Sequence, residues 1–295
     1  MLRLLLGVLL LFTGLRGNGQ QYSVALGLYG GITVPYTLDG GMDTDSRYKS
    51  NYTVKAQPIG LIFSMDYENI GFQLSPGIFT IGQNYYVVNS SGGQDGERKL
   101  DLHYAMLPIA LKVHLIDMSF FRVSALASAT PAFLYGASDH LHHNYTKLRF
   151  PSELYPALEN LPGYSIEYDG VVSPETNTIA SQKKDYKNLQ LFAGLGLCSD
   201  WNVTERWRIT FDFRVNYGLL DSRSPGYLNE INKYERFYDT PGKRQEMFAH
   251  LSIGVSRFLD FDKGDRDREK NLKGSKRKFQ PRSQIKMKRK RTPIH

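Results

Sequence analysis

The eleven residues from Trp207 to Tyr217 alternate strictly between apolar and polar side chains. Successive side chains of an extended strand point to opposite faces, so this stretch would have one wholly apolar face and one wholly polar face. A tilted strand needs about 9 to 11 residues to cross the hydrocarbon layer of a bilayer, and Trp and Tyr are enriched at both membrane interfaces. The stretch predicts a strand of a transmembrane β-barrel or, as the alternative, a half-buried strand of a soluble β-sandwich.

The first 19 residues have the features of a secretory signal peptide. Arg3 provides a positive charge, residues 4–12 form a short apolar segment, and Gly17-Asn18-Gly19 matches a small-x-small cleavage site. We therefore expect an exported mature chain that begins at Gln20. No later run approaches the roughly 18 uninterrupted apolar residues of a membrane-spanning helix, which excludes a helical membrane protein.

Seven further segments show the strand pattern, and a composition rich in Tyr and Phe also favours β structure. The eight predicted strands are residues 22–34, 55–67, 71–81, 100–114, 120–135, 189–197, 207–217 and 247–257. The fourth strand changes phase, because the apolar residues that follow Leu107 lie on one face and those from Leu100 to Tyr104 lie on the other. A bulge near Pro108 would repair this register, since proline cannot donate a hydrogen bond to a neighbouring strand.

The connections between these segments alternate in length. Those at residues 35–54, 82–99, 136–188 and 218–246 are long and polar, and those at 68–69, 115–119 and 199–206 are short. Outer-membrane barrels have short periplasmic turns and long outer loops, whereas soluble sandwiches have no reason to follow this rule. We therefore predict an all-β fold for residues 20–261: an eight-stranded antiparallel up-and-down β-barrel that contacts the lipid of the bacterial outer membrane, with both termini in the periplasm.

The interior of an eight-stranded barrel is only wide enough to be filled by side chains. The polar residues that face it would then form a packed core instead of an open channel. The predicted polar residues of the lumen are Asp66, Lys112, Arg208, Asp212 and Arg214, together with Arg122. Because isolated buried charges are costly, we expect opposite charges to meet, with Asp212 paired to an arginine of a neighbouring strand.

The net charge of +8 is concentrated in residues 262–295, which carry 14 Lys or Arg against 4 Asp or Glu. The basic clusters of this tail are Lys276, Arg277 and Lys278, followed by Lys288, Arg289, Lys290 and Arg291. Few apolar residues are present, so we expect a disordered periplasmic tail. Its partners there would be anionic, such as peptidoglycan, lipid head groups or an acidic protein, and not nucleic acid. The alternative is a tail that is merely solvated.

The fourth predicted strand also carries a family motif. Its matching residues are Tyr104, Leu107, Pro108 and Lys112. This pattern resembles the Tyr-x-x-Ile/Leu-Pro-Leu-x-x-Lys signature of the PorT-like outer-membrane β-barrel family of Bacteroidetes, although Ala105 and Met106 stand where members often have Leu-Glu. The resemblance extends over residues 20–260 and implies a small outer-membrane barrel. The namesake of that family is a component needed by the type IX secretion system.

Two groups of histidines are candidates for chemistry. His140, His142 and His143 have donor atoms suited to Zn or Cu, but loop histidines are more often solvated, so we expect no metal or other cofactor. His103 with Asp101, or His250 with Ser252, resembles the acid–base pairs of barrels that modify lipid A. Neither pair is accompanied by a nucleophile motif, so we expect hydrogen-bonded histidines and a protein that is not an enzyme.

The third and fourth long loops are rich in aromatic residues, which provide contact area for partners or pack over the barrel mouth. These residues are Tyr145, Tyr155, Tyr164, Tyr168, Tyr227, Tyr234, Phe237 and Tyr238. Together with the resemblance, the sequence predicts a non-enzymatic interaction component of a secretion or envelope-assembly machine, with protein partners in the outer membrane or periplasm. The alternatives are a lipid-modifying or ligand-binding barrel and a surface adhesin.

Overall fold

The computed structural model describes residues 22–144, 147–150, 164–168, 171–174, 178–236 and 238–259. The chain divides into two units after Phe258, and the fold concerns the first of them. The predicted signal peptide and basic tail lie outside the described residues. Within the described ranges, no helix has the length and apolar character needed to cross a membrane.

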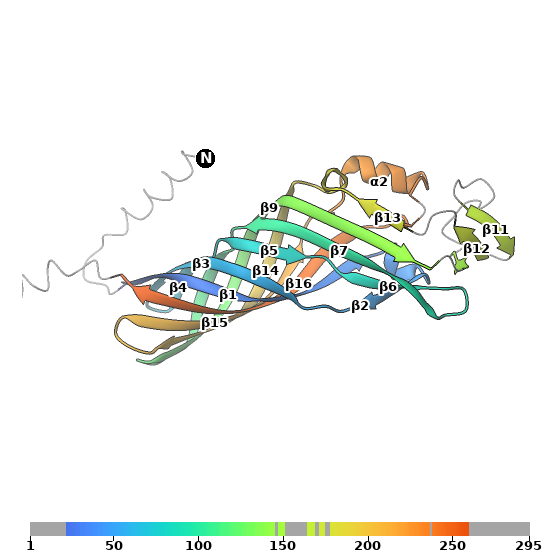
Figure 1. Ribbon diagram of the computed structural model, residues 1–295. Coiled ribbons are helices and arrows are strands. Elements are labelled where there is room, and N and C mark those ends of the chain that lie inside the picture. Colours follow the sequence, from blue (N-terminus) through green and yellow to red (C-terminus); the bar gives the residue numbers. More distant parts are fainter. Residues whose placement is uncertain are drawn as a thin grey trace, which may run out of the picture. The chain divides into compact units, whose positions relative to one another are not determined.

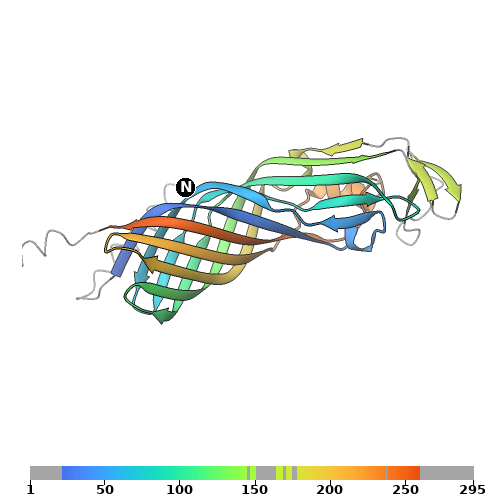
Figure 2. The same ribbon diagram turned by 60° about the horizontal axis from the view of Figure 1, so that its bottom comes forward.

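Antiparallel pairings join eight strands into a closed ring (Figures 1 and 2). The order around the ring is β1 (Tyr22–Asp39), β3 (Lys55–Tyr67), β4 (Ile70–Leu74), β8 (Ile109–Asp117), β9 (Phe121–His143), β14 (Leu189–Asn202), β15 (Trp207–Gly218), β16 (Arg244–Phe258) and again β1. A closed ring has no unpaired edge strand. The prediction of an antiparallel all-β fold is confirmed.

The two ends of the ring differ in their connections. At the turn end, the hairpins β3–β4, β8–β9 and β14–β15 are joined by residues 68–69, 118–120 and 203–206, close to the predicted turns. At the loop end, additional strands extend the sheet past the ring (Figure 1). They include β2 (Tyr48–Asn51), β5 (Gly77–Ile81), β6 (Asn84–Val88), β7 (Gln94–Met106) and β13 (Thr178–Ser181). The predicted long loops are therefore wrong in part, because pairing with β9 and β7 extends the sheet through them.

Smaller elements complete the loop end. They are the 3-10 helices η1 (Met42–Thr44) and η3 (Lys183–Asp185), the helix α2 (Pro225–Asn232), and a small sheet of β10 (Leu148–Arg149), β11 (Tyr164–Tyr168) and β12 (Val171–Pro174). Helix α2 begins with Pro225 in its first turn, and the side chain of Ser224 accepts a hydrogen bond from the backbone N–H of Tyr227. The loop end is thus folded, not only a set of irregular loops.

The expected change of phase near Pro108 is wrong. Leu100, Leu102 and Tyr104 are buried in the interior, and so are Ala110 and Lys112 beyond the proline. The even-numbered residues from Arg98 of β7 to Lys112 of β8 therefore face inward. The observed register shift lies instead between His103 and Tyr104, opposite β9. The apolar side chains of β7 point into the interior, which is apolar at this level.

The outward face of the ring carries a continuous apolar band. Its members include Leu26, Leu28, Leu61, Ile109, Leu111, Val113, Leu195, Leu197, Phe211, Phe213, Val215, Leu251, Ile253 and Val255, whose exposed fractions lie between 37% and 70%. Trp201 and Trp207 are exposed where this band meets the turn end. Water-soluble monomers rarely expose so large an apolar surface, whereas a lipid-facing barrel requires one.

The position of the band predicts the cost of placing a charge on it. We expect Leu195→Arg, near the middle of β14, to lower the free energy of unfolding by about 2–4 kcal/mol, and Leu189→Arg, at the loop-end edge, by about 0–1 kcal/mol. Denaturant titration of the protein refolded in lipid vesicles measures both values. Equal costs at the two positions would contradict a lipid-facing band.

Candidate functional site

Charged side chains from five strands meet inside the ring near the turn end. Alternation along the strands points Asp66 of β3, Lys112 of β8, Asp200 of β14 and Arg208 of β15 inward, and all four are buried. Arg208 Nη1 donates to Asp66 Oδ2 at 2.5 Å, and Lys112 Nζ lies 3.2 Å from Asp66 Oδ1 and 3.1 Å from Asp200 Oδ2. Arg122 Nη1 lies 3.4 Å from Asp66 Oδ2. We call these five residues the turn-end network.

Asp212 and Arg214 lie deeper in the ring. Arg214 Nε donates to Asp212 Oδ1 at 2.8 Å, and its Nη2 donates to Oδ2 of the same carboxylate. Gln73 Nε2 of β4 donates to Asp212 Oδ2 at 3.0 Å. The expectation of an arginine from a neighbouring strand is wrong for Asp212, because residues two apart on one strand share a face and Arg214 is within reach.

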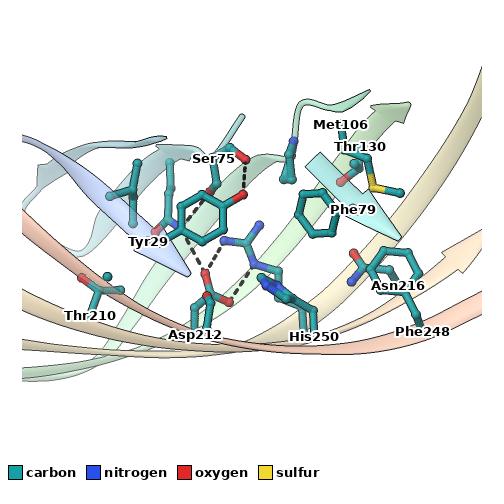
Figure 3. A pocket seen from close by; sticks show the side chains of 16 residues that line it. Tyr29, Ser75, Phe79, Met106, Thr130, Thr210, Asp212, Asn216, Phe248 and His250 are labelled. Atoms are coloured by element: carbon teal, nitrogen blue, oxygen red, sulfur yellow. Dashed lines mark hydrogen bonds and ion pairs between the residues drawn. The ribbon is translucent and has the colours of Figure 1, made fainter. Parts of the chain in front are cut away.

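A small cavity lies beside this pair (Figure 3). Its volume is about 10 Å³, which is room for about one water molecule. Tyr29 and His250 point toward it, and Tyr29 Oη donates to the backbone oxygen of Ser75 at 2.9 Å. The His250 ring packs edge-on against Phe79 with centroids 5.3 Å apart, and its Nε2 has no hydrogen-bond partner among the described residues.

Apolar side chains fill the next level of the lumen toward the loop end. This apolar layer includes Phe79, Ile81, Leu102, Tyr104, Met106, Leu134, Phe192 and Phe248, which come from β5, β7, β9, β14 and β16. The rings of Phe192 and Phe248 meet edge-on with centroids 5.4 Å apart. Because side chains from so many strands meet across the interior, the layer separates the charged groups on its two sides.

A second group of ion pairs, the loop-end network, lies beyond the apolar layer. Arg98 donates through Nε and Nη2 to Asp139 at 2.9 and 2.7 Å, and its Nη1 lies 2.8 Å from Asp239 Oδ1. Arg244 Nε donates to Glu246 Oε1 at 2.9 Å. Sequence reasoning missed these residues because they fall in predicted loops, although Arg244 and Glu246 continue the inward phase of His250.

The loop-end network favours the ionised form of Asp239. Burial alone would raise the pKa of this carboxyl, but the charge of Arg98 and hydrogen bonds from Arg98 and Tyr227 outweigh it and lower the pKa to about 2. A carboxyl whose pKa is depressed on folding stabilises the native state above its unfolded pKa of about 3.9. That contribution is lost as the pH falls toward 2.

The family-motif residues divide between the interior and the lipid face. Tyr104 belongs to the apolar layer, Pro108 lines the cavity, and Lys112 belongs to the turn-end network. Leu107 lies on the outward face and is 39% exposed. The strand is interrupted between β7 and β8, at Leu107 and Pro108. There the backbone N–H of Leu107 donates to Pro131 O at 3.0 Å.

The candidate metal-binding histidines do not converge. They lie on β9 instead of in a loop, and alternation exposes His140 and His142 while burying His143. His143 Nε2 hydrogen-bonds Tyr238 Oη at 2.5 Å, and burial lowers the pKa of its imidazole. Across the described ranges, no cluster of three or more His, Cys, Asp or Glu side chains is arranged to hold a metal ion.

Neither candidate acid–base pair is joined by a hydrogen bond among the described residues. His103 Nδ1 lies 3.0 Å from Thr80 Oγ1, and its ring stacks on Tyr135. Asp101 accepts instead from Lys55 Nζ at 2.6 Å. His250 and Ser252 both face the interior from β16, but no hydrogen bond joins them.

Two of the loop aromatic residues are buried within the loop end. Tyr227 Oη donates to Asp239 Oδ2 at 2.5 Å, and the Tyr238 carbonyl accepts from Tyr48 Oη at 2.7 Å. Tyr145, Tyr155 and Phe237 lie outside the described residues, as do Lys276, Arg277, Lys278, Lys288, Arg289, Lys290 and Arg291 of the tail.

Comparison with known proteins gives the family. The family model of the outer membrane protein beta-barrel domain matches residues 18–224 of the chain. The chain belongs to this family. Its predicted location in the bacterial outer membrane agrees with that membership and with the apolar band. No curated protein matches the sequence.

Solved outer-membrane proteins resemble the chain weakly. The outer membrane protein OprG from Pseudomonas aeruginosa is 12% identical with a TM-score of 0.39, and the match covers 82% of this chain and 98% of OprG. The attachment invasion locus protein Ail of Yersinia pestis is 11% identical with a TM-score of 0.32, covering 80% of this chain and 98% of Ail.

Asp66 is central to the turn-end network, because all three basic residues of that network contact it. We expect Asp66→Asn to lower the free energy of unfolding by about 3–5 kcal/mol, because Lys112 and Arg208 would lose a buried counter-charge. The matched control is Asp117→Asn, whose carboxylate pairs with Arg122 but is 43% exposed and should contribute about 0–1 kcal/mol. Urea unfolding in detergent micelles measures both, and similar losses would contradict the assigned network.

Proposed function

We propose that this protein is a non-enzymatic, eight-stranded outer-membrane β-barrel that acts by binding partners and not by conducting solutes. The observation that carries the proposal is the filled interior, in which one charged network lies on each side of an apolar layer. Eight-stranded barrels leave an interior that side chains can fill. A protein of this kind presents only its lipid face, its loop end and its termini to other molecules.

The arrangement of the chain ends supports a periplasmic binding role. Register partners Ala25 and Phe258 bring the start of β1 beside the end of β16 at the turn end. Short turns are typical of the periplasmic side of outer-membrane barrels, so both termini would face the periplasm. The basic residues 262–295 would then reach anionic partners there, such as peptidoglycan or an acidic protein.

The narrower role that we propose is that of an interaction component in a protein secretion or envelope-assembly machine. The motif shared with the PorT-like family supports the type IX-like form of this proposal. The histidines support a non-enzymatic role, since His103 Nδ1 meets the hydroxyl of Thr80 and not a carboxylate, and His250 Nε2 has no hydrogen-bond partner among the described residues.

A surface adhesin is the second candidate, and the folded loop end favours it. A separate apolar cluster holds this end together; it contains Met42, Tyr48, Tyr85, Val87, Leu141, Leu148, Phe150 and Tyr238. Rigid elements present a binding surface more accurately than mobile loops do. Adhesion of cells with and without the protein to immobilised host-matrix components distinguishes this role from a periplasmic one.

The closed interior predicts that the purified protein does not conduct. We expect no steady ionic current after reconstitution into a planar bilayer, with a known porin as the positive control for insertion. A stable open channel in the wild type would contradict the proposal, because the apolar layer would then have to open.

If the basic tail binds partners, removing it should weaken that binding without unfolding the barrel. We expect removal of residues 262–295 to reduce the recovery of partners that co-purify with the tagged protein, while the barrel keeps its heat-dependent shift on gels. The matched control replaces the seven clustered Lys and Arg residues by Gln and keeps the length of the tail. Unchanged recovery with both variants would remove the tail from the proposed function.

A further inference from the structure

The 3-10 helix η3 lies beside the lipid-facing band at the loop end. Lys183 Nζ is 5.7 Å from the centre of the Phe133 ring, which is 53% exposed on the outward face of β9. Phe133 is the register partner of Leu189, which is 62% exposed at the start of β14. The ammonium group of Lys183 therefore stands at the boundary between apolar band and polar surface.

The chain holds this turn in a defined conformation. The backbone N–H of Gln182 donates to Asp185 Oδ2 at 2.9 Å, and the N–H of Asp185 donates to the Gln182 carbonyl at 2.9 Å. The Asp185 carbonyl accepts from the N–H of Ser224 at 2.8 Å, which ties the turn to the segment before α2. With Asp185 buried, the side chains of Lys183 and Lys184 are directed to the surface and are exposed.

The neighbouring side chains leave a positive surface here. Neither Lys183 nor Lys184 forms an ion pair with a carboxylate in the described part of the chain. The unbalanced charge therefore belongs to the two lysines of η3.

We propose that Lys183 and Lys184 bind a phosphate group on the headgroup of an outer-leaflet lipid. The acyl chains of the same molecule would lie against Phe133 and Leu189, directly below. Lysine binds phosphate as a point charge, and basic clusters at a membrane surface attract anionic headgroups. A lipid uses both the charged and the apolar half of this surface, whereas a free phosphate ion uses only the first. The site rests on the proposed embedding of the ring.

The test is lipid binding by the full chain in detergent, followed by native mass spectrometry. The probes are bisphosphorylated lipid A, its dephosphorylated form and inorganic phosphate. We expect Lys183→Gln with Lys184→Gln to weaken binding of the phosphorylated lipid roughly fivefold for each lysine removed. The matched control, Lys49→Gln with Lys233→Gln, removes two exposed lysines at other places of the loop end and should bind as the wild type does.

The outcomes separate this site from the function on which it rests. Unchanged affinity in the η3 variant, equal affinity for the dephosphorylated lipid, or displacement of the lipid by equimolar inorganic phosphate would each overturn the site. All variants should keep the heat-dependent gel shift of a folded barrel. Absence of that shift in the wild type would instead overturn the embedded ring, and the lipid site with it.

Discussion

The pairing of β1 with β16 is the interaction on which the rest of the structure depends. It runs in register from Ala25 and Phe258 to Asp39 and Arg244, and it closes a sheet that would otherwise end in two unpaired edges. In lipid no water is available for unpaired backbone groups, so only a closed sheet of strands is stable there. At Gly27 a Cβ atom would lie 2.1 Å from the Val255 carbonyl oxygen, so glycine allows the close approach of the two strands.

Closure also determines what the interior must contain. Side chains that point inward have neither lipid nor bulk water around them, so charges there require partners. Asp66 and Arg98 each meet more than one group of opposite charge, and the apolar layer lies between their networks. The same packing is the basis for our proposal that the barrel does not conduct solutes. In the function that we propose, partners therefore bind at the loop end, the termini or the outer rim at η3.

The alternation of apolar and polar residues was sufficient to predict those strands that have one face wholly in an apolar environment and the other wholly in a polar one. Trp207 to Tyr217 is such a strand, with Arg208, Asp212 and Arg214 buried and Phe211, Phe213 and Val215 exposed. The same rule misled at Leu100 to Tyr104, because an apolar residue fits the lipid face and the apolar layer equally well. It was also silent at Arg98 and Asp139, which lie where strands extend into segments that were expected to be polar loops.

The sequence by itself determined the antiparallel all-β fold, the positions of the short turns and the inward direction of Asp66, Lys112 and Arg208. These properties follow from local periodicity, since a period of two assigns each residue to a face. Only the tertiary structure decided which charges meet, that Asp212 pairs along its own strand, and that His140 and His143 point apart. Such pairings depend on the stagger between strands distant in sequence, and local periodicity contains no information about that stagger.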